Sequence, residues 1–186
     1  MKNFLTLKHW QLFVLLFVFP LVLQIVGLSA MLSTRVPIWM TSIVPIVMII
    51  FWGLVLCWFY VLGTNLHRKL PPSVSMSLNL FKIFLIIPVV YAFSLSIILT
   101  YMFAEVPPGV ASNPEIFTWI YPLHLFVMFC IFYSFYFNAK ALKAVECQGT
   151  VTFSDYGGDF FLFWFFPIGI WIIQPRINQL FDQETE

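Results

Sequence analysis

Four long apolar runs alternate with short polar connectors along this chain. Each run exceeds twenty mostly apolar residues, which is the length that a helix needs to cross a hydrocarbon core of about 30 Å. The pattern therefore predicts an all-α, polytopic integral membrane protein, a four-transmembrane-helix bundle that forms one membrane domain. The predicted spans cover residues 10–32, 39–63, 80–104 and 116–139.

A fifth apolar stretch, at residues 160–175, follows the four runs. At 1.5 Å per residue it is too short to cross the hydrocarbon core, and Pro167 interrupts it. Its many Phe and Trp residues suit headgroup depth, yet they would surround a helix on all sides, so we expect it to be buried against lipid, the bundle or another subunit. We predict a C-terminal aromatic interfacial or re-entrant helix over residues 154–175. A full fifth span is the alternative.

The connector at residues 64–80 sets the expected orientation. It carries His67, Arg68 and Lys69 in a row, and such charges are costly in hydrocarbon. Lys and Arg gather in short cytoplasmic connectors, so we place this connector and both termini in the cytoplasm. With this topology only Arg35 lies outside. The Lys and Arg residues placed inside are Lys2, Lys8, Arg68, Lys69, Lys82, Lys140, Lys143 and Arg176.

Composition narrows the class of protein further. Only 9% of residues are charged and 61% are hydrophobic, whereas a soluble domain has about 25% charged residues. The net charge of +1 gives no basic surface for nucleic acid, so we expect the lipid bilayer, and no nucleic acid, as a partner. The three cysteines lack CxxC spacing, and we interpret them as reduced apolar residues.

Polar residues within the predicted spans are few. Gln24 and His124 are the candidates for polar intramembrane groups, and both are expected to hydrogen-bond another helix more readily than to bind a ligand. Ion and proton pathways normally place charged groups at membrane depth, and none lies near the middle of a predicted span. Each span nevertheless contains one proline, which indicates either simple kinks or the broken helices of a transporter.

Small residues recur at every fourth position on the third and fourth predicted spans. Such ridges let two helix backbones approach closely, and the two spans are antiparallel neighbours joined by a short loop. We expect the ridges to help form the interface between these helices, or else a contact with another subunit. The candidate packing residues are Ala92, Ser96, Thr100 and Ala104 on the third span, with Cys130, Ser134 and Asn138 on the fourth.

No catalytic motif of a hydrolase, metalloprotease, P-loop or dinucleotide-binding fold occurs in the sequence. Asp155 and Asp159 lie four residues apart and could share a divalent ion, but helix capping is the simpler interpretation. Ser154 supplies a helix-start signal beside them. We therefore expect no enzyme activity, no cofactor and no metal.

Three functions remain compatible with these features. The leading hypothesis is an accessory or structural subunit of a membrane complex, which requires a protein partner or self-association. The alternatives are a pore-forming or membrane-perturbing effector in bacterial defence or toxicity, and a small lipid-facing enzyme or carrier. The run FFLFWFFPIGIWIIQPRIN resembles small hydrophobic bacterial proteins, so the bacterial inner membrane is the expected location.

Overall fold

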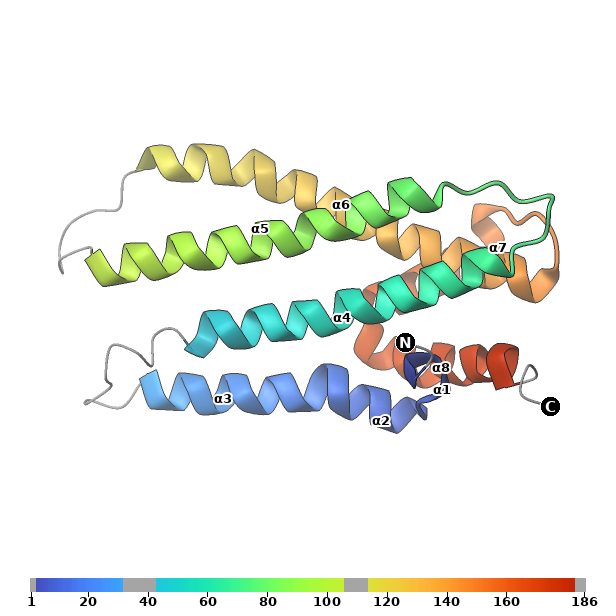
Figure 1. Cartoon of the computed structure of the whole chain (residues 1–186), viewed down its shortest axis with the longest axis horizontal. Coiled ribbons are helices and arrows are strands. Elements are labelled where there is room, and N and C mark those ends of the chain that lie inside the picture. The colour runs from blue at the N-terminus through green and yellow to red at the C-terminus, as the bar shows by residue number, and fades with distance from the viewer. Residues whose placement is uncertain (1–2, 32–42, 106–113, 183–186) are drawn as a thin grey trace.

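The computed structural model describes residues 3–31, 43–105 and 114–182, and every regular element in these ranges is a helix (Figure 1). The all-α prediction is therefore confirmed for the described residues. Four helical segments are long and apolar enough to cross a membrane. They are His9–Gly27, Ile49–Arg68, Leu78–Ile98 and Thr118–Cys147. The helices in chain order are α1 (Asn3–Thr6), α2 (His9–Phe13), the π-helix η1 (Val14–Val18), α3 (Phe19–Met31), α4 (Ile43–Arg68), α5 (Leu78–Glu105), α6 (Pro114–Cys147), α7 (Phe153–Trp164) and α8 (Phe166–Asp182).

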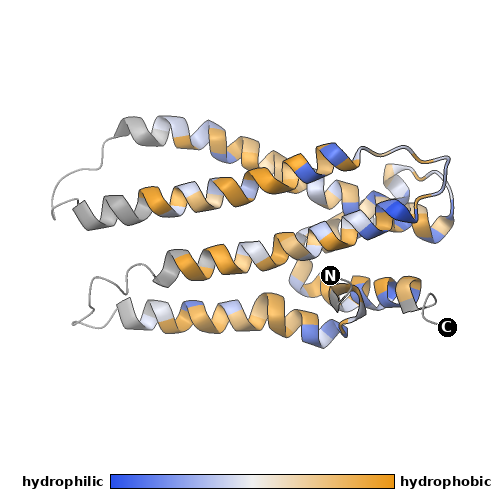
Figure 2. Cartoon of the chain, in the orientation of Figure 1, coloured by the Kyte–Doolittle hydropathy of each residue, from blue (hydrophilic) through white to orange (hydrophobic). Residues whose placement is uncertain are grey.

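Helix α4 is the centre of the bundle. It packs against α3, α5 and α6, and 44% of its apolar segment is buried, against 17% for α5. The α3–α4 and α5–α6 pairs diverge toward one end and meet at the other, where α7 and α8 lie (Figure 1). Hydrophilic residues gather at that same end, while the long middle of each helix is hydrophobic (Figure 2).

Two helices extend beyond the ends of the predicted spans. The second predicted span ended at residue 63, but helix α4 continues to Arg68. In these extra turns Thr64 and Asn65 donate side-chain hydrogen bonds back to Val61 O. Helix α6 continues to Cys147, as its helix-forming sequence favoured. Gln148, at φ 50°, then ends α6 in the left-handed conformation that is common after a helix.

Most prolines do not break their helices. Pro88 and Pro122 lie inside the continuous helices α5 and α6. The π-helix η1 directly precedes Pro20, and the missing amide hydrogen of proline favours such a local change in hydrogen bonding. Four prolines lie in the first turns of helices, where proline is well tolerated: Pro20 in α3, Pro45 in α4, Pro114 in α6 and Pro167 in α8.

The fifth apolar stretch forms a hairpin of two helices, α7 and α8, which meet at Phe165. At the start of α8 the ring of Phe166 lies 6.4 Å from Phe17 and 6.1 Å from Phe51. Phe51 is seventeen residues before Arg68, about 25 Å along the helix axis. The turn of the hairpin therefore reaches deep along the bundle.

The hairpin returns to the end of the bundle where it began. Lys69 Nζ, just after α4, donates a hydrogen bond of 2.5 Å to Leu180 O near the end of α8, and α1 packs against α8. The start of α1 and the end of α8 thus lie at the same end (Figure 1). The fifth stretch does not cross the bundle, and two helices replace the single one that was expected.

The hairpin has one buried and one exposed face. Phe163 is fully buried, with its ring 5.6 Å from Phe59 and 6.0 Å from Trp58 on α4. Ile170, Ile173 and Ile177 continue the buried face along α8. The bundle therefore covers one side of the stretch, and large apolar side chains remain exposed on the other. They are Phe161, Trp164, Phe165, Ile168, Trp171 and Ile172.

Gly169 permits the close approach of α7 and α8. A Cβ atom added at Gly169 would overlap the carbonyl group of Leu162, which is backbone and cannot move aside cheaply. Gly158, on α7, has no atom near its equivalent position. Gly158 and Gly169 therefore differ in the space that they leave for a methyl group.

We predict that Gly169→Ala lowers the free energy of unfolding by about 1–3 kcal/mol, the usual cost of overpacking. Gly158→Ala is the matched control, and it should leave stability unchanged or raise it by up to about 1 kcal/mol, because alanine favours helix. Thermal unfolding of the purified variants in detergent compares the two. Equal stability of both variants would show that the α7–α8 contact is not as close as described.

Candidate functional site: the Arg176 cluster under the C-terminal hairpin

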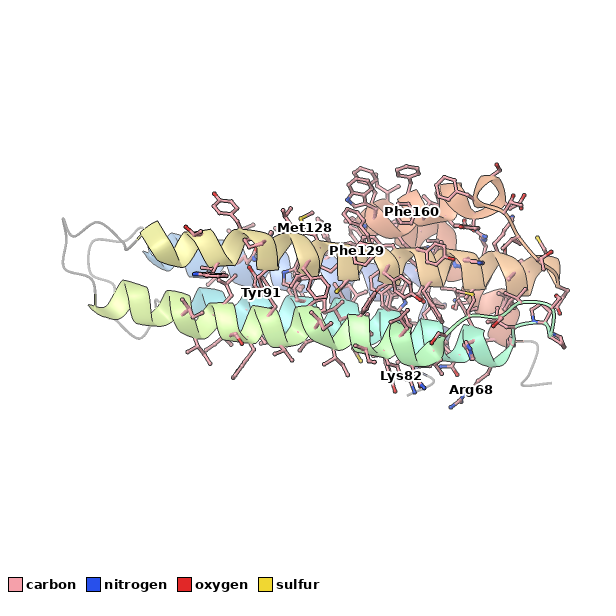
Figure 3. All side chains as sticks on the ribbon, turned by 90° about the horizontal axis from the view of Figure 1, so that it is seen from above. Arg68, Lys82, Tyr91, Met128, Phe129 and Phe160 are labelled. Atoms are coloured by element: carbon pink, nitrogen blue, oxygen red, sulfur yellow. The ribbon has the colours of Figure 1, made fainter. Side chains whose placement is uncertain are left out.

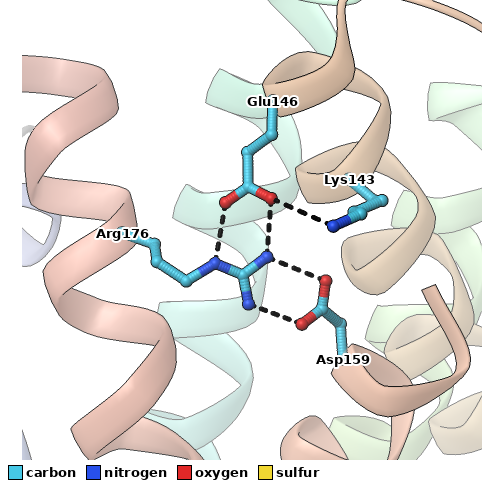
Figure 4. Close-up of polar contacts among 4 residues, drawn as sticks. All are labelled: Lys143, Glu146, Asp159 and Arg176. Atoms are coloured by element: carbon cyan, nitrogen blue, oxygen red, sulfur yellow. Dashed lines mark hydrogen bonds and ion pairs between the residues drawn. The ribbon is translucent and has the colours of Figure 1, made fainter. Parts of the chain in front are cut away.

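Arg176 joins three helices through two carboxylates (Figure 4). From α8, its Nε and Nη2 donate to Glu146 Oε1 and Oε2 at the end of α6, at 2.7 and 2.6 Å. Its Nη1 and Nη2 also donate to Asp159 Oδ1 and Oδ2 on α7, at 2.5 and 2.9 Å. Paired, parallel hydrogen bonds of this kind are among the stronger polar contacts in proteins.

The cluster is shielded from solvent and electrically balanced. Side-chain exposure is 27% for Arg176, 22% for Glu146 and 9% for Asp159, and Lys143 Nζ lies 4.0 Å from Glu146 Oε2. The hydrogen bonds that Arg176 donates to Asp159, and then those to Glu146, raise the pKa of Arg176 above its ordinary value. The guanidinium therefore stays charged, and its two partners are occupied by ion pairing instead of facing a substrate.

Amide side chains hold the other side of α8. Gln174 Nε2 donates to Phe4 O and Leu7 O, at 3.0 and 3.1 Å, and Asn178 Nδ2 donates to Leu7 O at 3.2 Å. Gln174 is fully buried, so breaking these bonds would leave polar groups without partners. The N-terminal segment, α6 and α7 are thus all attached to α8 by polar contacts.

Asp155 and Asp159 do not form a common site. Asp155 accepts hydrogen bonds from Thr152 N and Oγ1 at 2.7 and 2.8 Å, at the start of α7, whereas Asp159 binds Arg176. The cap of α7 is therefore Thr152 and not Ser154. Bonds from Thr152 hold the pKa of Asp155 below its ordinary value, so this cap stabilises α7 at neutral pH and is lost as the pH falls through that lowered pKa. Within residues 3–31, 43–105 and 114–182, no three His, Cys, Asp or Glu side chains are arranged to bind a metal.

The two polar intramembrane candidates lie on different helices. His124 Nδ1, on α6, lies 3.0 Å from the hydroxyl of Tyr91 on α5, a contact between neighbouring helices. Gln24 is partly buried on α3. The structure does not bring Gln24 and His124 together.

The candidate packing residues lie at different levels of the α5–α6 pair. Phe81 stacks on Phe137 at 4.2 Å, and Tyr91 contacts His124, so Ala92 and Ser96 lie in the half that contains His124. Cys130, Ser134 and Asn138 are buried in the other half. A Cβ added at Gly63 of α4 would lie 3.0 Å from Asn138 Oδ1, which places Asn138 against α4 as well. The side chains of Thr100 and Ala104 lie outside the described part of the chain.

Comparisons of this chain with protein-family models, curated proteins and solved structures find no match. The site is therefore interpreted from its own geometry. The sequence contains one signal for this cluster, namely an arginine, Arg176, directly after an apolar stretch. Such a charge needs a carboxylate partner, but Asp182 is nearer to Arg176 along the chain than Asp159 or Glu146, so the sequence alone would not have identified its partners.

We predict that Arg176→Gln lowers the free energy of unfolding by about 2–3 kcal/mol, because it leaves two shielded carboxylates without their charged donor. Lys143→Gln is the control, and it should change stability by less than about 0.5 kcal/mol, since exposed ion pairs contribute little. Thermal unfolding measures both variants. A loss that is equally small for both would show that the cluster does not hold the hairpin.

Proposed function

We propose that this protein is a non-enzymatic accessory subunit of a complex in the bacterial inner membrane. Its four long apolar helices cross the bilayer, and the α7–α8 hairpin re-enters the membrane from the cytoplasmic side. The cationic end of the bundle, with the N-terminus and the end of α8, faces the cytoplasm, in accord with the distribution of Lys and Arg. The first partner is the lipid bilayer, and the second is a helix of another membrane protein.

The observation that carries this proposal is the exposure of His124. Its partner Tyr91 lies thirteen residues beyond the first residue of α5, about 20 Å along that helix, so the pair is at membrane depth. His124 is nevertheless exposed. Its Nδ1 contacts Tyr91, so its Nε2 is available for a second hydrogen bond. Polar groups at this depth normally face protein instead of lipid, so a partner helix with a hydrogen-bonding side chain fits here.

The surroundings of His124 support the same conclusion. All six residues from 121 to 126 are exposed, although a helix in a complete bundle has at least one covered face. Tyr121 is 72% exposed and Leu125 67%. The half of α6 that carries His124 therefore has room for a neighbour on several sides, and the divergence of the two helix pairs in Figure 1 lies at this same end.

The rigid end of the molecule suits a scaffold. The Arg176 cluster and the aromatic contacts of Phe163 fix α7 and α8 to the bundle, and the groups of the cluster are engaged with one another. A fixed hairpin with an apolar outer face would hold the open half of α5 and α6 at a defined position for a partner.

We predict that a photo-crosslinking amino acid at Leu125 captures a distinct membrane polypeptide in native membranes. The control probe is at Ile25 on α3, which is similarly exposed at 59%, and it should not capture that polypeptide. Mass spectrometry of the purified adducts identifies the partner. Links only between copies of this chain, in a defined ring, would contradict the proposal and favour the pore-forming alternative.

We also predict that His124→Phe weakens the capture at Leu125 about 3- to 18-fold, because an interhelical hydrogen bond contributes about 0.6–1.7 kcal/mol. The matched control is Phe126→Leu, an apolar exchange two residues away, and it should retain capture. Capture that is unaffected by His124→Phe would show that the histidine does not recognise the partner.

A further inference from the structure

A cleft lies between the last turns of α4 and the first turns of α5, at the cationic end of the bundle. Its volume is about 250 Å³, which is small for a drug-sized ligand, since such ligands occupy about 300–1,000 Å³. The cleft therefore suits a compact group such as a phosphate with a few attached atoms. Its lining consists of Tyr60, Val61, Thr64, Asn65, Arg68, Leu78 and Lys82.

Two cations from different helices line this cleft without a carboxylate partner. Arg68 ends α4 and Lys82 lies near the start of α5, and both side chains point to the same side of the molecule (Figure 3). Among the residues that the structure describes, the ion pairs of Lys and Arg side chains involve Lys143 and Arg176 instead. Arg68 and Lys82 thus give the cleft a charge of +2 that no carboxylate in its lining balances.

The position of Lys82 adds to this imbalance. It is the fifth residue of α5, and the first turn of that helix contains no acidic residue. The N-terminus of a helix carries partial positive charge from its free amide groups, so a cation there is unfavourable and an anion is favourable. A bound anion would therefore relieve the repulsion between Lys82, Arg68 and the start of α5.

An apolar strip leads away from the cleft along α5. Its members follow Lys82 at intervals of three or four residues, which places them on one helix face. All are more than half exposed: Ile86 60%, Val90 58%, Phe93 56% and Ile97 53%. The strip is long enough to lie beside an acyl chain.

We propose that this cleft binds the phosphodiester headgroup of an anionic phospholipid, with one acyl chain along the α5 strip. Arg68 and Lys82 neutralise the phosphate from two sides, and Tyr60 and Asn65 border the headgroup. The proposal rests on the placement of α4 and α5 across the bilayer that the proposed function includes. It does not depend on the partner helix at His124.

The test uses native mass spectrometry of the full-length protein in detergent, titrated with phosphatidylglycerol or phosphatidylcholine. The wild type should bind phosphatidylglycerol in preference to phosphatidylcholine. The variant Arg68→Gln/Lys82→Gln should bind it about 25-fold more weakly, since each cation near an anionic headgroup contributes roughly five-fold. The matched control, Lys8→Gln/Lys140→Gln, removes two cations elsewhere and should retain binding.

Further arms separate the remaining explanations. The charge-preserving variant Arg68→Lys/Lys82→Arg should keep the preference, and thermal unfolding should show that all variants are folded. Equal weakening in both Gln variants, or no weakening in either, would overturn the site. Displacement of the lipid by millimolar inorganic phosphate would also overturn it, because the occupant would then be free phosphate.

A final comparison separates this inference from the proposed function. Photo-crosslinking from Leu125 is repeated in the Arg68→Gln/Lys82→Gln variant, where capture of the partner should persist. If the variant loses lipid binding but retains capture of the partner, the cleft is an independent site. Loss of capture together with lipid binding would show that the cleft is part of the partner interface, which contradicts the inference.

Discussion

The interaction on which the rest of this structure depends is the pairing of Arg176 with Glu146 and Asp159. A guanidinium inside a polar end of an apolar bundle must be neutralised, and two carboxylates from separate helices do this with four hydrogen bonds. These bonds fix the end of α8 to α6 and α7. Gln174 then adds the N-terminal segment to the same unit.

This constraint divides the molecule into two dissimilar halves. At the end with the cluster, aromatic rings from α4, α6 and the hairpin pack against one another, and the buried core is continuous. Toward the other end, the helix pairs diverge and α6 is exposed around His124. The first half supplies rigidity. The second half exposes His124 and the residues around it, which is the basis for the proposal of a partner helix.

The sequence predicted the parts of this fold that follow from length and hydropathy. Four apolar runs became four long helices, and the fifth stretch did not cross the bundle, because hydropathy and length report directly on such segments. The hairpin could not be anticipated in the same way. Its turn at Phe165 lies two residues before Pro167, and its closure depends on the contact between Gly169 and Leu162, which only the three-dimensional path brings together.

The polar residues show the same limit of prediction from sequence. His124 was expected to hydrogen-bond another helix, and the contact with Tyr91 is of that kind. In contrast, Asp155 and Asp159 were interpreted together as helix caps, and only Asp155 caps α7, whereas Asp159 binds Arg176. Spacing along a helix indicates which side chains share a face, and it does not show which distant charge reaches them.

The most direct test of this account is the accessibility of single cysteines in a chain whose native cysteines are replaced. Ser154→Cys and Gln179→Cys mark the two ends of the hairpin, and Ile168→Cys marks its turn, which is 65% exposed and so is not shielded by the protein itself. The account predicts that a membrane-impermeant maleimide labels both ends from the same face of sealed vesicles. It also predicts that lipid protects the turn from both faces. Labelling of Gln179→Cys from the face opposite to Ser154→Cys, or rapid labelling of Ile168→Cys, would contradict the re-entrant hairpin.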